Sequence, residues 1–233
     1  MIRAFRPVSS GSGWGRNDYG QCNAPAPNSS FVSVAAGHVH SLGLRSDGSI
    51  VAWGANNFGE CNVPVPNTGF VSVAGGAHHS LGLKADGSIV AWGSNYDNFG
   101  QYAGQCDIPA PNSGFIGVAG GGFHSLGLKA DGSIVAWGDD SFGQCNIALP
   151  NTGFVAIGGG ENHSLGVKAF YGDLNCDGAL NAFDIDPFIL ALTDSTAYAG
   201  AYPRCHRLNA DCNADGIVDA FDIDPFVALL TGP

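Results

Sequence analysis

The chain has 233 residues, of which 45% are hydrophobic and 12% are charged, with 36 glycines and 12 prolines. This hydrophobic content argues against a disordered chain, and the abundance of glycine and proline favours a turn-rich, mainly β protein. The net charge of −11, with nine Lys and Arg and no basic run, excludes an electrostatic nucleic-acid interface.

Residues 1–170 are built from a repeated unit. Similar segments begin at residues 31, 70, 115 and 154, in steps of 39, 45 and 39, and HSLGLKADGSIVAWG occurs unchanged at 79–93 and 124–138. In each unit, runs such as FVSVA, SLGLK and SIVAWG predict short strands, and the Asp-Gly between the last two predicts a hairpin. Segments such as PVPN break the chain before the next unit. Units of about forty residues with about four strands have the size of β-propeller blades.

Each unit repeats a histidine, a tryptophan and a cysteine. They are His40, His79, His124 and His163; Trp14, Trp53, Trp92 and Trp137; and Cys22, Cys61, Cys106 and Cys145. Groups that recur with the period of a fold usually serve the fold, so we interpret the His-Ser pairs, tryptophans and cysteines as buried architecture. The alternative is a ring of four histidines that converge on a metal. We assign no catalytic residue, because a site needs one asymmetric constellation.

The motif GxxHSLxLxxDGxxxxWGxNxxGQ, which recurs over about residues 10–170, resembles the repeats of the regulator of chromosome condensation family. The resemblance implies a β-propeller, usually of seven blades. In that family the eukaryotic founder is an exchange factor for a small GTPase, and bacterial relatives include secreted proteins and a protein inhibitor. Cysteine follows GQ where the family often has leucine, which supports a buried role for the thiols.

The repeats sum to about four blades, because the chain starts at the Trp14 strand and its last unit stops after HSLGVKA at 163–169. Three readings remain open. The ring closes with four blades when SSGSGWG supplies the missing strand, which removes open sheet edges. Alternatively, another chain completes an incomplete arc, or the sequence is a fragment of a longer product, as the lack of a visible signal peptide favours.

Residues 171–233 carry a second duplication, at 172–192 and 210–230, and most of the negative charge. Each copy contains D-x-N-x-D-G with an acidic residue at loop position twelve, a spacing that wraps Ca²⁺ with oxygens from positions 1, 3, 5, 7, 9 and 12. The first loop offers Asp173, Asn175, Asp177, the Ala179 carbonyl, Asn181 and Asp184. The second offers Asp211, Asn213, Asp215, the Ile217 carbonyl, Asp219 and Asp222. We expect two calcium ions, on which folding depends because the carboxylates otherwise repel one another.

Aspartate at position twelve, where EF-hands usually have glutamate, makes residues 171–231 similar to a dockerin domain. That resemblance implies a helix after each loop, here over 187–192 and 225–230, and calcium-dependent docking onto a cohesin-type partner. Recognition positions ten and eleven hold Ala-Phe in both loops, at 182–183 and 220–221, which departs from the usual Ser/Thr and leaves the partner type open. The duplicated AFDIDPF implies two equivalent binding orientations. Among Cys176, Cys205 and Cys212, the pair Cys205–Cys212 is our first choice of disulfide.

These observations predict a mainly β protein, with propeller repeats over 1–170 and a small α-helical domain with two EF-hand-like loops over 171–233. We expect a non-enzymatic, extracellular or cell-surface interaction protein without a membrane span, whose propeller binds an unknown protein or glycan. One alternative is a carbohydrate-binding or polysaccharide-degrading component, for which Asp139–Asp140 with Glu161 is the only acidic cluster worth noting. Another alternative is a protein inhibitor or exchange factor.

Overall fold

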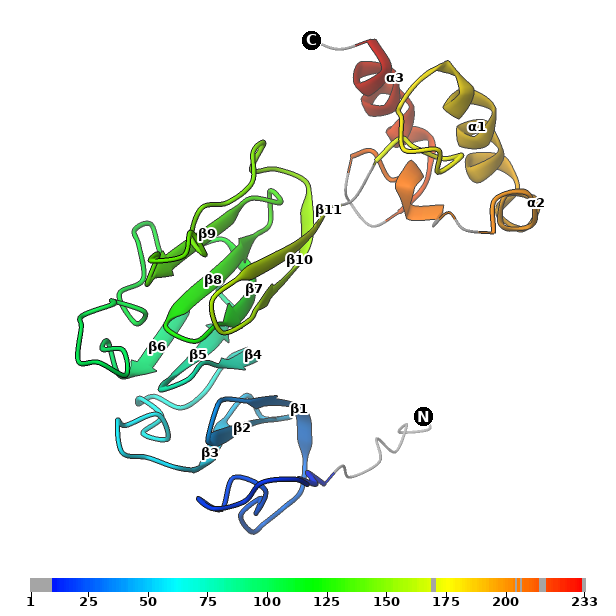
Figure 1. Cartoon of the computed structure of the whole chain (residues 1–233). Helices are drawn as coiled ribbons and strands as arrows, with labels where there is room; N and C mark the ends of the chain where they lie inside the picture. The colour runs from blue at the N-terminus through cyan, green and yellow to red at the C-terminus, as the bar shows by residue number, and fades with distance from the viewer. Residues whose placement is uncertain (1–9, 169–170, 204, 206, 214–216, 232–233) are drawn as a thin grey trace, which may run out of the picture. The chain divides into compact units, whose positions relative to one another are not determined.

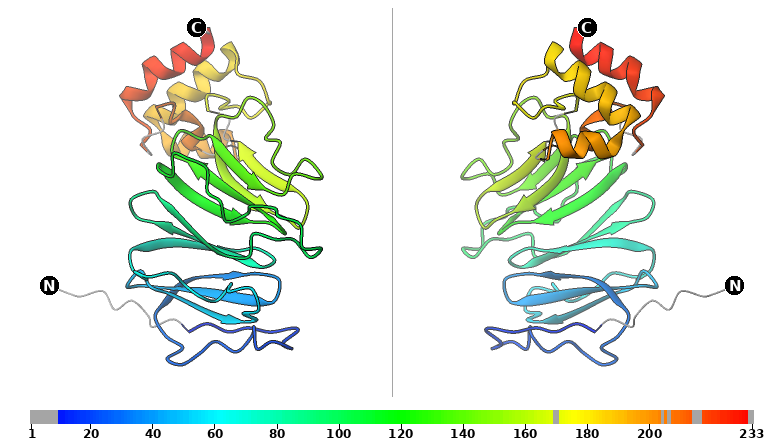
Figure 2. Two further views of the ribbon diagram at one scale, coloured as in Figure 1. Left: turned by 90° about the vertical axis from the view of Figure 1, so that its left-hand side faces the viewer. Right: turned by 90° about the vertical axis from the view of Figure 1, so that its right-hand side faces the viewer.

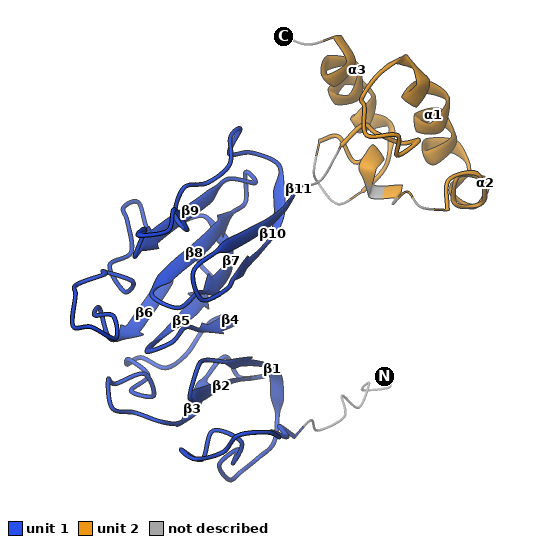
Figure 3. Ribbon diagram, in the orientation of Figure 1, with its two compact units in different colours: residues 1–168 blue, residues 169–233 orange. Residues whose placement is uncertain are grey.

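The computed structural model describes residues 10–168, 171–203, 205, 207–213 and 217–231 (Figure 1). The chain divides into two compact units, residues 1–168 and 169–233 (Figure 3). Within the described part of the chain, no helix combines the length and the apolar character needed to cross a bilayer.

The first unit consists of four small antiparallel sheets. Sheet 1 contains β1 (Phe31–Ala36), β2 (His40–Arg45) and β3 (Ile50–Gly54); sheet 2 contains β4 (Phe70–Gly75), β5 (His79–Lys84) and β6 (Ile89–Gly93); sheet 3 contains β7 (Phe115–Gly120), β8 (His124–Lys129) and β9 (Ile134–Gly138); sheet 4 contains β10 (Phe154–Gly159) and β11 (Ser164–Lys168). A complete sheet therefore has three strands, which corrects the expected number of about four.

The proline-rich segment of each unit replaces the fourth strand. Proline has no backbone N–H for a ladder, so a segment such as PVPN is a poor strand. Instead, the Asn67 side chain pairs with the backbone of Ile50: its Oδ1 accepts from the Ile50 N–H at 2.8 Å and its Nδ2 donates to the Ile50 carbonyl at 2.8 Å. Asn112 and Asn151 bind Ile89 and Ile134 in the same way. One asparagine side chain thus bonds both the N–H and the carbonyl of the first residue of each third strand.

The predicted hairpins at Asp-Gly are confirmed. Gly48 has φ +78°, and the Asp47 carboxylate accepts bonds from the N–H and hydroxyl of Ser49 at 2.9 and 2.6 Å. The same turn joins β5 to β6 and β8 to β9. Glycine is required because its φ lies in the left-handed region.

The cores lie between the sheets. Leu42, Leu44 and Ile50 of sheet 1 pack against Phe70, Val73 and Trp92 of sheet 2. Equivalent residues join sheet 2 to sheet 3 and sheet 3 to sheet 4. Full burial of one such leucine stabilises the fold by roughly 1.5–3 kcal/mol, so these clusters hold the row of sheets together.

The sheets follow one another in a row, and β1, β4, β7 and β10 contact one another in that order. Figure 2 shows the sheets of the first unit stacked in this way, and Figure 1 shows sheet 1 and sheet 4 at opposite ends of the row. Residues 11–15 lie beside sheet 1, where the Gly11 N–H donates to Asn28 Oδ1 at 2.7 Å. Sheet 4 has two strands. The closed ring, in which residues from SSGSGWG complete the last unit, is therefore not formed in this structure.

The second unit is helical. It contains η1 (Ala182–Asp184), α1 (Ile185–Thr193), α2 (Ser195–Ala201), η2 (Arg207–Ala210), η3 (Ala220–Asp222) and α3 (Ile223–Thr231). α1 and α3 begin two residues before the predicted helices, so that Pro187 lies in the first turn, where its missing N–H costs nothing. The rings of Phe188 and Phe226 stack at 3.9 Å between their centroids in the core. The sequence patterns did not predict α2.

Candidate functional site

A histidine–serine hydrogen bond joins each pair of neighbouring sheets. The distance from His79 Nε2 to Ser125 Oγ is 2.9 Å, and the Ser125 hydroxyl donates in turn to the Gln105 carbonyl at 2.8 Å. His40–Ser80 and His124–Ser164 repeat the bond at 3.0 Å. Each histidine therefore binds the serine of the next sheet, not the serine beside it in the motif, which confirms the architectural interpretation.

The hydrogen-bond roles define the protonation state of these histidines. Because the Ser125 hydroxyl donates to a carbonyl, its oxygen accepts from His79, so the neutral imidazole carries its proton on Nε2. His79 Nδ1 is buried without a partner. Burial lowers the pKa of His79 to about 3 and that of His40 to about 4, and it also lowers the pKa of His124. A second proton on the ring would have no acceptor.

The tryptophans add hydrogen bonds at the same interfaces between sheets. Trp92 Nε1 donates to the Glu60 carbonyl at 2.9 Å, and Ser80 Oγ donates to the same oxygen at 2.8 Å. The carbonyls of Gln21 and Gln105 likewise accept one serine hydroxyl and one indole. Trp53, Trp92 and Trp137 thus pack in the blades, as predicted, whereas Trp14 is exposed, contrary to the prediction.

The histidines do not gather around a metal. Of the residues that the structure describes, no three His, Cys, Asp or Glu side chains form a group that could hold a metal ion. The imidazoles of His40, His79 and His124 are instead distributed one to each sheet interface, where each bonds to a serine. This finding contradicts the four-histidine alternative.

The repeat cysteines are free thiols that bond to the backbone. Cys61 Sγ lies 3.1 Å from the Ala55 carbonyl, and the other three contact equivalent carbonyls. Burial raises the pKa of Cys61 and Cys145 to about 11 and that of Cys106 to about 12. The thiols of Cys61, Cys106 and Cys145 are therefore protonated at neutral pH and are poor nucleophiles.

Asp139 and Asp140, which were considered for glycoside hydrolysis, instead accept hydrogen bonds within their own loop. Asp139 accepts from Ser141 and from the Gln144 side chain, and Asp140 caps the Cys145 N–H at 2.8 Å. These carboxylates hold a loop. Glu161 lines a separate cavity of about 270 Å³ between the ends of the sheets, together with backbone glycines.

An aromatic cluster lies beside this cavity and was not foreseen. The His78 ring lies 4.5 Å from the Phe58 ring and 5.8 Å from the Phe123 ring, between centroids. Its Nε2 lies 2.8 Å from Asn98 Oδ1. Asn98 lies in the segment 94–106, whose extra residues make the step from 70 to 115 longer than the other two.

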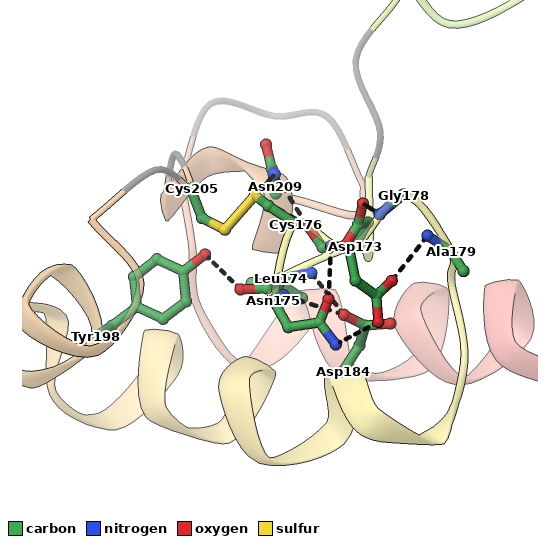
Figure 4. Close-up of a disulfide and its surroundings, with 11 residues drawn as sticks. Asp173, Leu174, Asn175, Cys176, Gly178, Ala179, Asp184, Tyr198, Cys205 and Asn209 are labelled. Atoms are coloured by element: carbon green, nitrogen blue, oxygen red, sulfur yellow. Dashed lines mark hydrogen bonds between the residues drawn. A yellow bond between two sulfur atoms is a disulfide. The ribbon is translucent and has the colours of Figure 1, made fainter.

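In the second unit, the first predicted calcium loop wraps around its own backbone N–H groups (Figure 4). Asp173 Oδ2 accepts from the Gly178 N–H at 3.0 Å, and Gly178 has φ +87° at position six. The buried Asp184 carboxylate accepts from the N–H groups of Leu174, Asn175 and Asn181. Asp177 caps the Ala179 N–H and accepts from the Asn175 amide, while Asn181 caps Phe183. Asp173 Oδ1 is buried and has no partner.

The second loop follows the same plan where it is described. Asp222 is buried and accepts from the N–H groups of Asn213 and Asp219 at 3.1 and 2.9 Å. Asp211 is buried and Ile217 is exposed. Asp215 lies outside the described residues. Asn181 and Asp219, at position nine of each loop, head matching capping boxes with Asp184 and Asp222.

The disulfide joins Cys176 to Cys205, with their Cα atoms 5.8 Å apart, which corrects the expected Cys205–Cys212 pair. The turn after α2 brings residue 205 against the first loop, whereas Cys212 Sγ faces the Asn209 carbonyl at 3.9 Å. Nearness in sequence therefore misled the pairing. Burial raises the pKa of the free Cys212 thiol to about 12.

The two copies of AFDIDPF present matching apolar side chains to solvent. Phe183 and Phe221 are 78% and 79% exposed. Ile189 and Val227 are also exposed, at equivalent positions of α1 and α3. The sequence had marked the two phenylalanines only as a departure from the dockerin pattern.

Comparisons with known proteins address the first unit. Residues 31–60, 70–101 and 115–144 match the regulator of chromosome condensation (RCC1) repeat. No curated protein matches the chain. The three matched segments coincide with sheets 1 to 3 and the turns that follow them.

Among solved structures, the same fold occurs in the yeast protein Prp20. Prp20p from Saccharomyces cerevisiae, whose structure is described with its binding to Gsp1p and histones, has 21% identity and a TM-score of 0.52 over 66% of this chain and 51% of that chain. Yeast RCC1 (Prp20) bound to Kap60 has 20% identity and a TM-score of 0.51 over 66% of this chain and 49% of that one. The ectodomain of the Arabidopsis thaliana receptor kinase ACR4 has 26% identity and a TM-score of 0.46 over 59% and 46%. This chain spans about half the length of these proteins, and sheets 1 to 3 of its first unit match the RCC1 repeat.

Proposed function

We propose that this protein is a non-enzymatic adaptor of the cell exterior, in which the RCC1-type unit binds a partner protein and the C-terminal unit is a calcium-dependent anchor of dockerin type. The carrying observation is the duplicated loop of the second unit, with its matching capping boxes and its two exposed phenylalanines. Protein binding by the first unit is supported by its fold, since Prp20p, which has the same fold, binds Gsp1p and histones.

The residue types of the first loop are those that a hard cation prefers, although in this structure no three acidic side chains of the described residues converge into a group that could hold a metal ion. Among the described residues, the buried Asp173 Oδ1 has no hydrogen-bond partner, and an uncompensated buried charge is costly unless a cation binds it. Asp177 and the Asn181 side chain supply further oxygens at loop positions five and nine. Calcium prefers such oxygens, and Gly178 permits the sharp turn. Bound calcium would neutralise the carboxylates, and the loop residues would hold each helix start in place.

The exposed phenylalanines are suited to a protein partner. Apolar side chains grouped on a surface mark interaction sites, and Phe183 and Phe221 head two equivalent faces on η1–α1 and η3–α3. The proposed partner is a cohesin-type domain that can use either face. The Cys176–Cys205 disulfide supports an oxidising, extracellular setting.

Calcium binding is tested on the chelator-treated full chain by titration calorimetry and by thermal unfolding followed by circular dichroism. We expect two ions per chain and a stabilisation of about 2.7 kcal/mol for each bound ion when free calcium is about 100 times the dissociation constant of the site. Asp173→Ala and Asp211→Ala should each reduce the stoichiometry to one. Asp186→Ala, an exposed aspartate outside both loops, should keep two ions. Absence of heat and of any shift in melting would refute the anchor.

Docking is tested with a panel of cohesin domains in the presence and absence of calcium. Because the two faces are equivalent, Phe183→Ser and Phe221→Ser should each retain binding, and the double variant should lose it. Phe142→Ser changes a phenylalanine that is equally exposed but lies in the first unit, and it serves as the control. Binding that survives in the double variant would contradict the proposed surface.

A further inference from the structure

Neighbouring sheets of the first unit meet through one recurring set of contacts, which we call the joint. Sheet 1 and sheet 4, at the two ends of the row, each carry only one side of this joint. At an interior joint, a histidine binds the next sheet's serine, an indole and that serine share one carbonyl, and two leucines pack on the next sheet. The histidine–serine bond occurs between sheets 1 and 2, 2 and 3, and 3 and 4, and the indole takes part at the first two of these interfaces. Comparison with the interior joints therefore shows which contacts are missing at each end of the row.

Residues 11–15 at the leading end have the geometry of a third strand without a sheet of their own. The Gly11 N–H and carbonyl pair with the Asn28 side chain at 2.7 Å, as the first residues of β3, β6 and β9 pair with their asparagines. Gly15 has φ +103°, beside +104°, +107° and +109° for the glycines that end those strands. Trp14, in the place of the interior tryptophans, is 88% exposed.

The leading face of sheet 1 is also incomplete. Ser41 Oγ donates to the Gln21 carbonyl at 2.8 Å like its interior counterparts, but no imidazole in the described part of the chain reaches it. Val34 is 62% exposed, whereas its equivalent Val73 is 8% exposed under the preceding sheet. A cavity of about 530 Å³ opens here, lined by Trp14, Val34, Ser41 and neighbouring residues.

Sheet 4, at the trailing end, lacks the matching half. Leu165 on β11 is 65% exposed, whereas its equivalent Leu126 is 1% exposed. His163 is exposed, and the structure shows no serine against its ring among the residues it describes. The Gln144 carbonyl accepts Ser164 Oγ at 2.7 Å but, in the described chain, no indole.

We propose that these two ends join head to tail between two copies of this chain. Residues 11–15 of one copy become the third strand of sheet 4 of the other, in the register of β2 and β3, which places Trp14 opposite Ser164 and Gly15 opposite His163. His163 of the copy that supplies sheet 4 then binds Ser41 of the copy that supplies residues 11–15. The Trp14 indole of the latter copy reaches the Gln144 carbonyl of the former. Each group that lacks its partner at one end finds that partner at the other.

A second copy is the occupant that this complementarity specifies. The leading and trailing ends lie at opposite ends of the row (Figure 1), so one copy cannot join its own ends without rearranging the sheets. Two identical joints close a pair of chains into one ring. That ring has eight sheets, which lies within the range of four to eight blades found in propellers.

The head-to-tail pair is tested by the mass of the full chain in solution, measured by light scattering after size-exclusion chromatography at micromolar concentration. We expect twice the 23.8 kDa of one chain. Trp14→Asp disables the leading end and Leu165→Asp the trailing end, and each variant alone should run as a monomer. Both positions are exposed, so circular dichroism should show an unchanged fold.

Mixing the two variants separates this joint from any other dimer. The intact trailing end of Trp14→Asp fits the intact leading end of Leu165→Asp, so an equimolar mixture should regain a one-to-one dimer. Phe99→Asp, as exposed as Trp14, and Val155→Asp, whose equivalents remain exposed in every sheet, should leave the parent dimer intact. A monomeric parent chain, or two monomeric variants that fail to combine, would overturn the proposal.

Discussion

Acid should destabilise the first unit through its buried histidines. Burial lowers the pKa of His40 from 6.5 to about 4 and that of His79 to about 3. Below pH 6.5 the unfolded chain therefore binds protons that the folded chain refuses, so the free energy of unfolding falls as the pH falls. The loss continues until the pH reaches the folded pKa values.

The magnitude follows from the same two values. Between pH 7 and pH 5, each of His40 and His79 should lower the free energy of unfolding by roughly 2 kcal/mol, or about 4 kcal/mol together. This is a large share of the about 5–15 kcal/mol that stabilises a typical domain. His124, whose pKa burial also lowers, adds to the loss.

Tryptophan fluorescence during urea unfolding isolates this effect, because all four tryptophans lie in the first unit. The measurement compares pH 7 with pH 5 for the parent, for His79→Gln, and for His38→Gln, which changes an exposed histidine. Glutamine can still donate to Ser125 but does not titrate, so His79→Gln should shrink the loss between the two pH values by roughly 2 kcal/mol. An equal loss in His79→Gln and the parent would refute the reasoning.

Three further substitutions test the packing. Asn67→Ala leaves the Ile50 backbone groups without partners and should cost about 1–3 kcal/mol in the same fluorescence assay. Cys205→Ser opens a disulfide with a sequence separation of 29 and should destabilise the second unit by roughly 3–4 kcal/mol, measured by circular dichroism. Phe188→Ala removes one ring of the stack with Phe226 and should cost about 3–5 kcal/mol.

Each substitution has a control on the same unit. Asn57→Ala changes an exposed asparagine of the same connection between β3 and β4 and should leave the free energy of unfolding within about 0.5 kcal/mol of the parent's. Cys212→Ser changes a cysteine outside the disulfide, and Ile189→Ala an exposed residue of the same helix as Phe188. Equal costs for a substitution and its control would show that the named contact is not the cause.

Local patterns predicted the elements of this protein well. The alternation in SLGLK and SIVAWG predicted the second and third strands of each sheet, because side chains of a strand alternate between its two faces. Asp-Gly predicted the turns, and the resemblance of the two loops to a dockerin domain predicted α1 and α3 to within a few residues. Calcium binding at the two loops stays a prediction.

The pattern failed where the outcome depended on a distant partner. The expected fourth strand is absent because the Asn67 amide, 17 residues from Ile50, takes its place at the edge. Cys205 pairs with Cys176 because the turn after α2 carries it there. Neither partner can be read from spacing along the chain.

The sequence by itself determined the repeat, the hairpins and the loop–helix duplication, because each depends on residues that are close along the chain. Only the tertiary structure decided that His79 reaches Ser125 in the next sheet, 46 residues away, and that the two ends of the row stay apart. The physical reason is that period and turn chemistry act within one unit, whereas the contacts between units depend on how whole sheets pack.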